Sequence, residues 1–580
     1  MAFHERWVAA LMLAASMLMG GCGGGEGDTP PTVRDTSFGR IQGSDDSAAT
    51  GTYAWKGVPF ASPPVGALRW KAPVDPDAWT GTRAATEFGN ACAQYGRIYG
   101  PGANNTYDET IATTLNQAVG SEDCLYLNVW RPASGEANLP VIVFIHGGSN
   151  VSGYTADPMY DGAMLAKTAN AVVVTVNYRL GIFGWLNVPQ LKDGSSAADD
   201  SGNFATLDTI KALQFVSRNA AAFGRDAGNV TVMGQSAGAI NVYALLTSPL
   251  VVNADPPLMH KAMPVSGGFS LASNLPPGSI PTLNPASTAL AQGNALLEQL
   301  LIADGTAADT AAAQAYVGTQ TPAQVAAYLR GKDPAALVTT LLTTLGPLGL
   351  SGSGPIPDGV VVPTDPVAAI NAGDYLAVPV LASNTRDEAK LFPTFLALPA
   401  LGGASGRLVT DAQLFTSHFN YDPDAAPTVT IDQWIPAQYL PVDTPVTGFT
   451  ARTDLLNNVF FIASRDNILD ALKAQQPEVW YYRFDWDEEP APWNDIYGAA
   501  HAFDLPFLFG NFGPSLFANV MSSTANRAGR LDLSDAMMQS IAAFARNGDP
   551  NNAALGVTWP AWPSELLFDA TATEKRISVQ

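Results

Sequence analysis

Short apolar runs alternate with amphipathic segments along most of this chain. Short, continuous runs rich in β-branched residues are typical of strands that are buried on both faces of a sheet. Such runs lie at residues 141–145, 171–176, 230–233, 378–381 and 479–484. Apolar residues recur at helical spacing just before the third run: Leu207, Ile210, Leu213 and Val216. The alternation predicts an α/β fold with a mostly parallel central sheet flanked by helices.

Two segments do not follow this alternation. Residues 275–350 are rich in Ala, Thr, Leu and Pro with a helical pattern, and residues 395–475 mix Pro, Asp and aromatic residues. Both lie between predicted strands, so we expect large helical insertions that roof the active site. Active groups of parallel sheets gather at the carboxyl ends of the strands. No linker divides residues 33–580, which we therefore predict to be a single domain.

The amino terminus has the pattern of an export signal. Arg6 precedes an apolar run at 7–19, which is too short for a lasting membrane span. We predict a signal over 1–22 and a flexible Gly/Pro-rich tether over 23–32. Two glycines before Cys22 resemble a bacterial lipoprotein signal, which predicts lipidation of Cys22 and anchoring at the cell envelope. The alternative is an ordinary cleaved signal and a periplasmic or secreted protein.

The net charge and the apolar runs limit the partners that are expected for this protein. The net charge of −22 argues against nucleic acid as a partner, because nucleic-acid binding needs clustered Lys and Arg. No later run is long enough for a second span, so membrane attachment is expected only through Cys22.

Cys92 and Cys124 are the remaining cysteines, and in an exported protein they predict one disulfide rather than two buried thiols. The sequence carries no signal of oligomeric state.

The stretch Gly234-Gln235-Ser236-Ala237-Gly238 joins the apolar run at 230–233 to an apolar helical segment at 239–246. A strand, a Gly-x-Ser-x-Gly turn and a helix are the context of a nucleophile elbow. The glycines allow a sharp turn that leaves the serine hydroxyl exposed, and the helix directs its free N–H groups to the same place. Ser236 is therefore the predicted nucleophile.

A serine hydroxyl at neutral pH needs a base, which is usually a histidine. The chain has five histidines, and four are poorly placed, in the signal, in a glycine loop after a strand, close behind the serine, or in an insertion: His4, His146, His260 and His418. His501 lies in a loop after the strand at 479–484. It fits the chain order serine, acid, histidine of this architecture, so His501 is the predicted base.

The base needs an acid, and the reaction needs donors for an oxyanion. Glu388 follows the strand predicted at 378–381 and is the best-placed acid, although the pattern alone leaves the adjacent Asp387 open. The expected oxyanion donors are the backbone N–H groups of Ala237, Gly148 and Ser149. No His/Cys cluster has the spacing of metal ligands and no glycine-rich loop is suited to phosphate, so no cofactor is expected.

These residues resemble the type-B carboxylesterases, the cholinesterase-like branch of the α/β-hydrolases, over nearly the whole chain after the tether. The resemblance is carried by Phe223-Gly224-Arg225-Asp226-Ala227-Gly228 with the elbow, Ser121-Glu122-Asp123-Cys124-Leu125, Asn177-Tyr178-Arg179-Leu180-Gly181 and Pro63-Pro64-Val65-Gly66. It implies an α/β-hydrolase fold and a small-molecule ester as substrate. It implies the same site: Ser236, Glu388, His501, the donors Gly148, Ser149 and Ala237, and a Cys92–Cys124 disulfide.

The chain departs from the family pattern near the predicted site. Gln235 stands where the family usually has glutamate, which removes a negative charge beside His501. Arg225 replaces a glycine, and Ser149-Asn150 replaces a glycine-aromatic pair. The loop between the two cysteines lacks the tryptophan with which cholinesterases bind choline by a cation–π contact, so choline esters are not expected.

Two other functions suit the same fold. A lipase for long acyl chains would need a mobile apolar lid, for which the Ala/Leu-rich residues 330–350 are a candidate. A non-catalytic binding protein would lack part of the triad, whereas Ser236, Glu388 and His501 are all present. The sequence therefore favours a serine hydrolase of carboxylic esters.

Overall fold

The computed structural model describes residues 30–392 and 409–580. The predicted signal with Cys22, residues 23–29 of the tether and the start of the second predicted insertion lie outside that part. Thr32, which we expected in the tether, is instead buried against the domain. Its carbonyl accepts hydrogen bonds from Trp55 Nε1 at 2.7 Å and Gly43 N at 2.9 Å. Among the described helices, none has the length and apolar character needed to cross a membrane.

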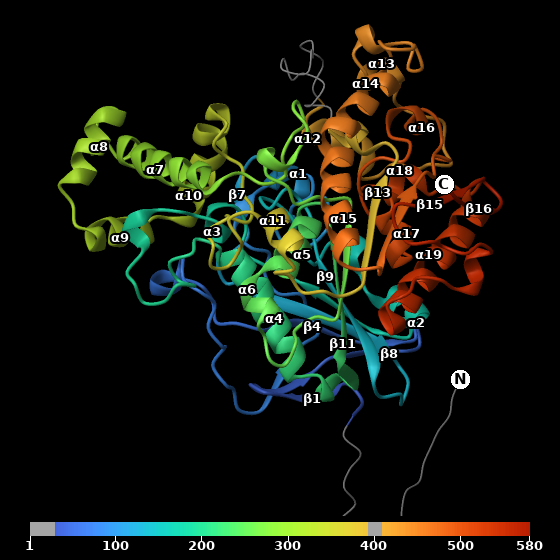
Figure 1. Ribbon diagram of the computed structural model, residues 1–580, viewed down its shortest axis with the longest axis horizontal. Coiled ribbons are helices and arrows are strands. Elements are labelled where there is room, and N and C mark those ends of the chain that lie inside the picture. Colours follow the sequence, from blue (N-terminus) through green and yellow to red (C-terminus); the bar gives the residue numbers. More distant parts are fainter. Residues whose placement is uncertain (1–29, 393–408) are drawn as a thin grey trace, which may run out of the picture.

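An eleven-stranded sheet runs through the centre of the molecule (Figure 1). Its strands, in spatial order, are β16 (Lys575–Val579), β15 (Leu566–Ala570), β14 (Val479–Phe484), β13 (Val380–Thr385), β12 (Lys261–Val265), β11 (Arg225–Gln235), β9 (Leu139–Ile145), β10 (Val172–Val176), β8 (Tyr126–Pro132), β4 (Thr52–Pro59) and β3 (Ser44–Asp46). Neighbours from β15 through to β10 are parallel, and the outer pairs are antiparallel. The predicted mostly parallel sheet is confirmed.

All five apolar runs lie in strands of this sheet, but the fourth prediction begins too early. The strand at 378–381 was expected to include Pro379, which has no N–H for the ladder, and β13 starts at Val380. It continues through the polar residues Ser383 to Thr385, which the apolar pattern did not include. Those polar residues lie at the carboxyl end of the strand, where the site is found.

The two faces of the sheet each carry a core. Along β9, Val141, Val143 and Ile145 belong to one core, whereas Ile142 and Phe144 belong to the other. Side chains alternate between faces along a strand, so a continuous apolar run is what a strand covered on both sides requires. The first face is covered by α4 (Phe204–Arg218), α5 (Ala237–Thr247) and α15 (Ala463–Gln475), and the second by α2 (Ala163–Ala169), α17 (Leu505–Phe509) and α19 (Arg527–Asn547).

The two predicted insertions differ in what they do. The first forms α7 (Ala286–Ala303), α8 (Thr310–Gly318), α9 (Pro322–Arg330) and α10 (Pro334–Thr339), which lie together on one side of the molecule (Figure 1). They share a third core with Ile182 and Phe183, the residues that follow the block at 177–181. The last helix of the second segment, α15, covers the sheet, so the expectation that all of 395–475 is a roof was wrong.

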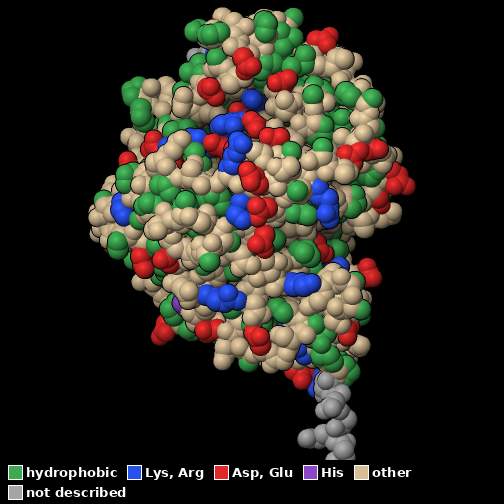
Figure 2. All heavy atoms as spheres, turned by 90° about the vertical axis from the view of Figure 1, so that its right-hand side faces the viewer, with side chains coloured by type: hydrophobic (Ala, Val, Ile, Leu, Met, Phe, Trp, Pro, Cys, Tyr) green, Lys and Arg blue, Asp and Glu red, His purple; other side chains and the backbone are tan. Residues whose placement is uncertain are grey.

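Several basic side chains are paired with acidic ones. Figure 2 shows Lys and Arg next to Asp and Glu on the face seen there. Lys575 Nζ lies 2.6 Å from Asp532 Oδ1, and Arg483 Nε lies 2.6 Å from Asp485 Oδ1. Both pairs are partly buried.

Candidate active site

Ser236 is the single residue between β11 and α5. Its backbone has φ 58° and ψ −122°, a region that residues with a side chain rarely adopt and that stores strain at functional sites. Both elbow glycines are needed because the backbone approaches closely. A Cβ on Gly234 would lie 2.3 Å from Gly238 O, and one on Gly238 would lie 2.1 Å from Ile145 O. The predicted strand–turn–helix context is confirmed.

The glycine loop after β9 packs directly against this elbow. A Cβ on Gly147 would lie 2.9 Å from Ser236 Cβ, and the loop continues with Gly148 at φ +98° and Ser149 at φ +55°. Within residues 30–392 and 409–580, the backbone N–H groups of Gly148, Ser149 and Ala237 donate no hydrogen bond. Three unused donors therefore adjoin the serine.

Glu388 and His501 meet in the buried interior although 113 residues separate them. His501 Nδ1 and Glu388 Oε2 form a very short hydrogen bond. The other carboxylate oxygen, Oε1, accepts from Asn384 Nδ2 and from the backbone N–H of Thr385, each at 2.9 Å. Three donors thus fix the Glu388 carboxylate, and it in turn fixes the imidazole with Nδ1 as the protonated nitrogen.

Asp387, the acid that the sequence left open, points elsewhere. Its carboxylate accepts from Arg386 Nη2 at 2.8 Å and from the backbone N–H of Ala499 at 3.1 Å, and Lys390 Nζ lies 3.3 Å away. Its own N–H donates to the carbonyl of Ala499 at 2.9 Å. Asp387 therefore ties the loop that carries His501 to the loop that carries Glu388, and the structure selects Glu388 as the partner of the imidazole.

The ring nitrogen of His501 that does not bond Glu388, Nε2, is contacted by Gln235, the residue that precedes the serine. Gln235 Nε2 lies 3.1 Å from His501 Nε2. This contact spans 266 residues of sequence and places the imidazole beside the elbow. The sequence identified Gln235 only as an uncharged substitute for glutamate, because a periodic pattern carries no information about a pairing over that separation.

The remaining described histidines have other partners. His146 is buried, its Nδ1 lies 2.9 Å from Gly147 O, and burial lowers its pKa to about 4. His418 packs on Trp493 and bonds the hydroxyl of Tyr497, and burial lowers its pKa to about 3. His260 accepts from Val230 N at 3.2 Å.

A second buried carboxyl group lies three residues after His501. Asp504 is fully buried, and its Oδ2 accepts from the Tyr482 hydroxyl at 3.1 Å. Burial, and next the nearby Glu388 carboxylate, raise the pKa of Asp504 from 3.8 to about 7. No sequence pattern pointed to it, because Tyr482, Glu388 and His501, which surround it, come together only in the fold.

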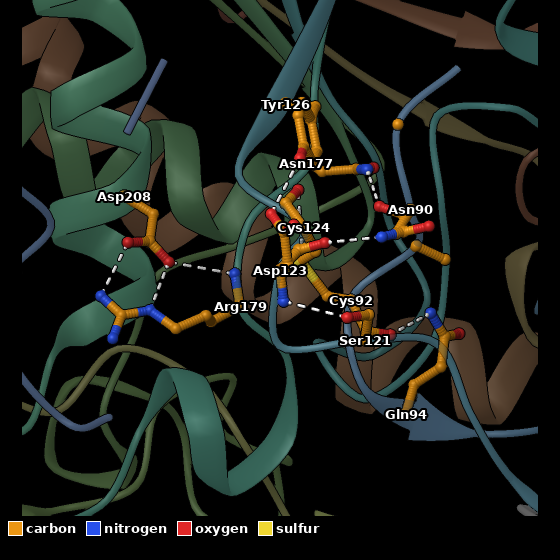
Figure 3. Close-up of a disulfide and its surroundings, with 12 residues drawn as sticks. Asn90, Cys92, Gln94, Ser121, Asp123, Cys124, Tyr126, Asn177, Arg179 and Asp208 are labelled. Atoms are coloured by element: carbon orange, nitrogen blue, oxygen red, sulfur yellow. Dashed lines mark hydrogen bonds and ion pairs between the residues drawn. A yellow bond between two sulfur atoms is a disulfide. The ribbon is translucent and has the colours of Figure 1, made fainter. Parts of the chain in front are cut away.

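The Cys92–Cys124 disulfide is present, with Cα atoms 4.9 Å apart, which confirms the predicted pairing. Figure 3 shows the disulfide and, near it, the buried ion pair of Arg179 and Asp208. Arg179 Nη2 lies 2.7 Å from Asp208 Oδ1 and its Nε lies 2.8 Å from Oδ2. Such a bidentate pair fixes the chain after β10 against α4.

Comparison with known proteins places this arrangement among esterases. A family model described as "Carboxylesterase family" matches residues 30–576. The para-nitrobenzyl esterase of Bacillus subtilis (strain 168) is 30% identical over 551 residues, which cover 93% of this chain and 95% of that protein. The fumonisin B1 esterase of Sphingopyxis macrogoltabida is 32% identical over 544 residues, or 92% of this chain and 85% of the relative.

Solved structures agree with these relatives. The crystal structure of the Geobacillus stearothermophilus carboxylesterase EST55 at pH 6.8 superposes with a TM-score of 0.67 at 30% identity, over 95% of this chain and 98% of that one. A para-nitrobenzyl esterase structure superposes with a TM-score of 0.67 at 26% identity, over 95% and 97% of the two chains. The central sheet and its flanking helices thus form the α/β-hydrolase fold.

Proposed function

This chain belongs to the carboxylesterase family and is a carboxylic-ester hydrolase, and from that premise we propose that it acts through an acyl-enzyme formed on Ser236, with His501 as base and Glu388 as acid. The observation that carries the proposal is the buried Glu388–His501 hydrogen bond. Gln235 contacts the other ring nitrogen of His501, which places the imidazole beside the strained backbone of Ser236. Backbone strain at a serine persists only where the surrounding structure enforces it, and such positions cluster at active sites.

The chemistry proceeds in two halves. Ser236 Oγ attacks the ester carbonyl carbon while its proton passes to His501 Nε2. The imidazolium then gives this proton to the departing alkoxide, which leaves as the alcohol, and the acyl group remains on Ser236. A water molecule attacks the acyl ester while its proton passes to His501 Nε2. The imidazolium then gives this proton to Ser236 Oγ as the acyl–oxygen bond breaks, so the carboxylic acid leaves and Ser236 is restored. Glu388 keeps the proton on Nδ1 throughout and stabilises each imidazolium.

The negative charge that forms on the carbonyl oxygen needs donors that are already in place. The unused N–H groups of Gly148, Ser149 and Ala237 supply them, and a donor of this kind is typically worth about 3–4 kcal/mol of transition-state stabilisation. Gly148 and Ser149 are successive residues of the glycine loop, and both have positive φ angles. Acyl transfer requires donors that are held in place in this way before the reaction begins.

The test is the hydrolysis of p-nitrophenyl acetate, butyrate and palmitate by the protein and by Ser236→Ala. We expect hydrolysis of the short esters that Ser236→Ala lowers by about 10⁴-fold or more. Ser540→Ala, which removes a buried serine hydroxyl of α19, is the matched control and should keep its rate. Palmitate as the best substrate would favour the lipase alternative, and equal rates in Ser236→Ala and the parent protein would refute the proposal.

A further inference from the structure

Gln235 occupies a position between the two halves of the candidate site. Its side chain is 3% exposed and lies at the end of β11. Its amide nitrogen lies 3.1 Å from His501 Nε2, and its amide oxygen lies 2.8 Å from where a Cβ on Gly147 would be. The carboxamide therefore fills the space between the imidazole and the glycine loop, and glycine at 147 leaves room for it.

The chemistry of the partners sets the direction of the Gln235–His501 hydrogen bond. The Glu388 carboxylate can only accept, so His501 Nδ1 carries the proton of the neutral ring. Nε2 is then a lone-pair acceptor, and the amide N–H of Gln235 donates to it. In the proposed function this lone pair receives the proton of Ser236, so the amide N–H of Gln235, which can be displaced without any proton transfer, must first give way to the serine hydroxyl.

A carboxylate at position 235 would have the opposite effect. It has no proton to donate to a neutral Nε2, so it would favour the imidazolium, whose Nε2–H it can accept. Together with His501 it would hold one extra proton between the carboxylate and Nε2. Until that proton leaves, the lone pair of Nε2 is not available to the serine hydroxyl.

We propose that Gln235 is a positioning residue that keeps His501 neutral in the resting enzyme and so preserves its base at acidic pH. The inference rests on the proposed function, because it assigns Gln235 a role relative to the base of that reaction. It depends on the geometry at one atom, His501 Nε2, which Gln235 contacts from the residue adjoining the nucleophile. The other titratable groups that act on this ring, Glu388 and Asp504, are the same in the parent protein and in the variant tested below. The enzyme is therefore expected to stay active at a lower pH than it would with glutamate at this position.

The experiment is the pH dependence of kcat/KM for p-nitrophenyl butyrate with the parent protein and Gln235→Glu, over about pH 5 to 9. We expect the acidic limb of the profile to move upward by about 1 to 3 pH units in Gln235→Glu, as for an opposite charge placed within contact distance. The height of the plateau is a separate matter, because loss of packing alone would lower it without moving the limb.

Gln292→Glu is the matched control. Gln292 is also a buried glutamine, but its amide donates to the carbonyls of Leu350 and Gly352 in the first insertion. Its substitution adds the same charge away from His501, so the limb should stay in place. An acidic limb that coincides in Gln235→Glu and the parent protein would overturn the inference and leave the proposed function standing.

A measurement on the unsubstituted protein keeps the test decisive if Gln235→Glu does not fold. With ¹⁵N-labelled histidine, the nitrogen chemical shifts report which ring nitrogens carry protons. On the plateau of the pH profile we expect His501 to show a protonated Nδ1 and an unprotonated Nε2. A protonated Nε2 on that plateau would refute the inference. Absence of Ser236-dependent hydrolysis in the parent protein would instead refute the proposed function.

Discussion

Substitution of Asp504 by asparagine tests how a buried carboxyl group close to Glu388 and His501 affects stability. Asparagine has nearly the same shape, is neutral at every pH and still offers an oxygen to the Tyr482 hydroxyl, which donates to Asp504 Oδ2 at 3.1 Å. The substitution therefore removes the titration of this group and preserves its hydrogen bond. Any pH-dependent difference between the two proteins then comes from the carboxyl group itself.

The magnitude follows from the pKa of Asp504, which burial and Glu388 raise from 3.8 to about 7. In the unfolded chain this group ionises near pH 4, whereas in the folded protein it keeps its proton until the pH passes about 7. The folded state thus binds more protons over that interval, and its stability falls as pH rises. At about 1.4 kcal/mol per pH unit, the loss amounts to roughly 4 kcal/mol between pH 4 and 7.

We therefore expect Asp504→Asn and the parent protein to have similar free energies of unfolding near pH 4. At pH 7 and above, the variant should be more stable, with an upper value of about 4 kcal/mol. Urea unfolding followed by tryptophan fluorescence at a series of pH values measures this difference. Asp374→Asn at an exposed position is the control, because that carboxylate stays in water in both states. A difference between Asp504→Asn and the parent that stays constant from pH 4 to 8 would refute the reasoning.

Two further predictions concern the disulfide and the elbow. Replacing both Cys92 and Cys124 by serine opens a loop with a sequence separation of 32, and should lower the free energy of unfolding by about 4 kcal/mol in the chain-entropy model; an unchanged urea midpoint would contradict this. Gly238→Ala brings a Cβ within 2.1 Å of Ile145 O and should displace the elbow, lowering kcat/KM about 100-fold while circular dichroism stays the same; unchanged kcat/KM would show that the glycine is not needed.

Local patterns in the sequence were sufficient for the elements that carry the site. The apolar runs marked the strands because a strand buried on both faces must be apolar at every position. The elbow glycines marked the turn because only glycine tolerates the close approach to Gly238 O and Ile145 O. His501 could be predicted as the base by elimination because the chain holds only five histidines.

The sequence was less informative where two neighbours have the same chemistry or where an element has two uses. Asp387 and Glu388 are adjacent carboxylates, and a rotation of the chain by one residue exchanges their directions. Only the hydrogen bond of Asp387 to Ala499 N, and of Glu388 to His501, separates their roles. Likewise, the amphipathic pattern of α15 suits both a helix over the active site and a helix that covers the sheet. Its apolar side chains pack in the core on one face of the sheet, which decides between the two.

The sequence by itself determined the class of fold and the disulfide, and it predicted Ser236 as the nucleophile and His501 as the base, since each depends on residue type, local spacing or a count. Tertiary structure alone decided the partner of the imidazole, the contact of Gln235 with His501 Nε2 and the raised pKa of Asp504. The physical reason is that hydrogen-bond direction and desolvation depend on groups brought together from distant parts of the chain. A difference of about 3 Å in the position of one side chain determines such an interaction, and no periodicity in the sequence records it.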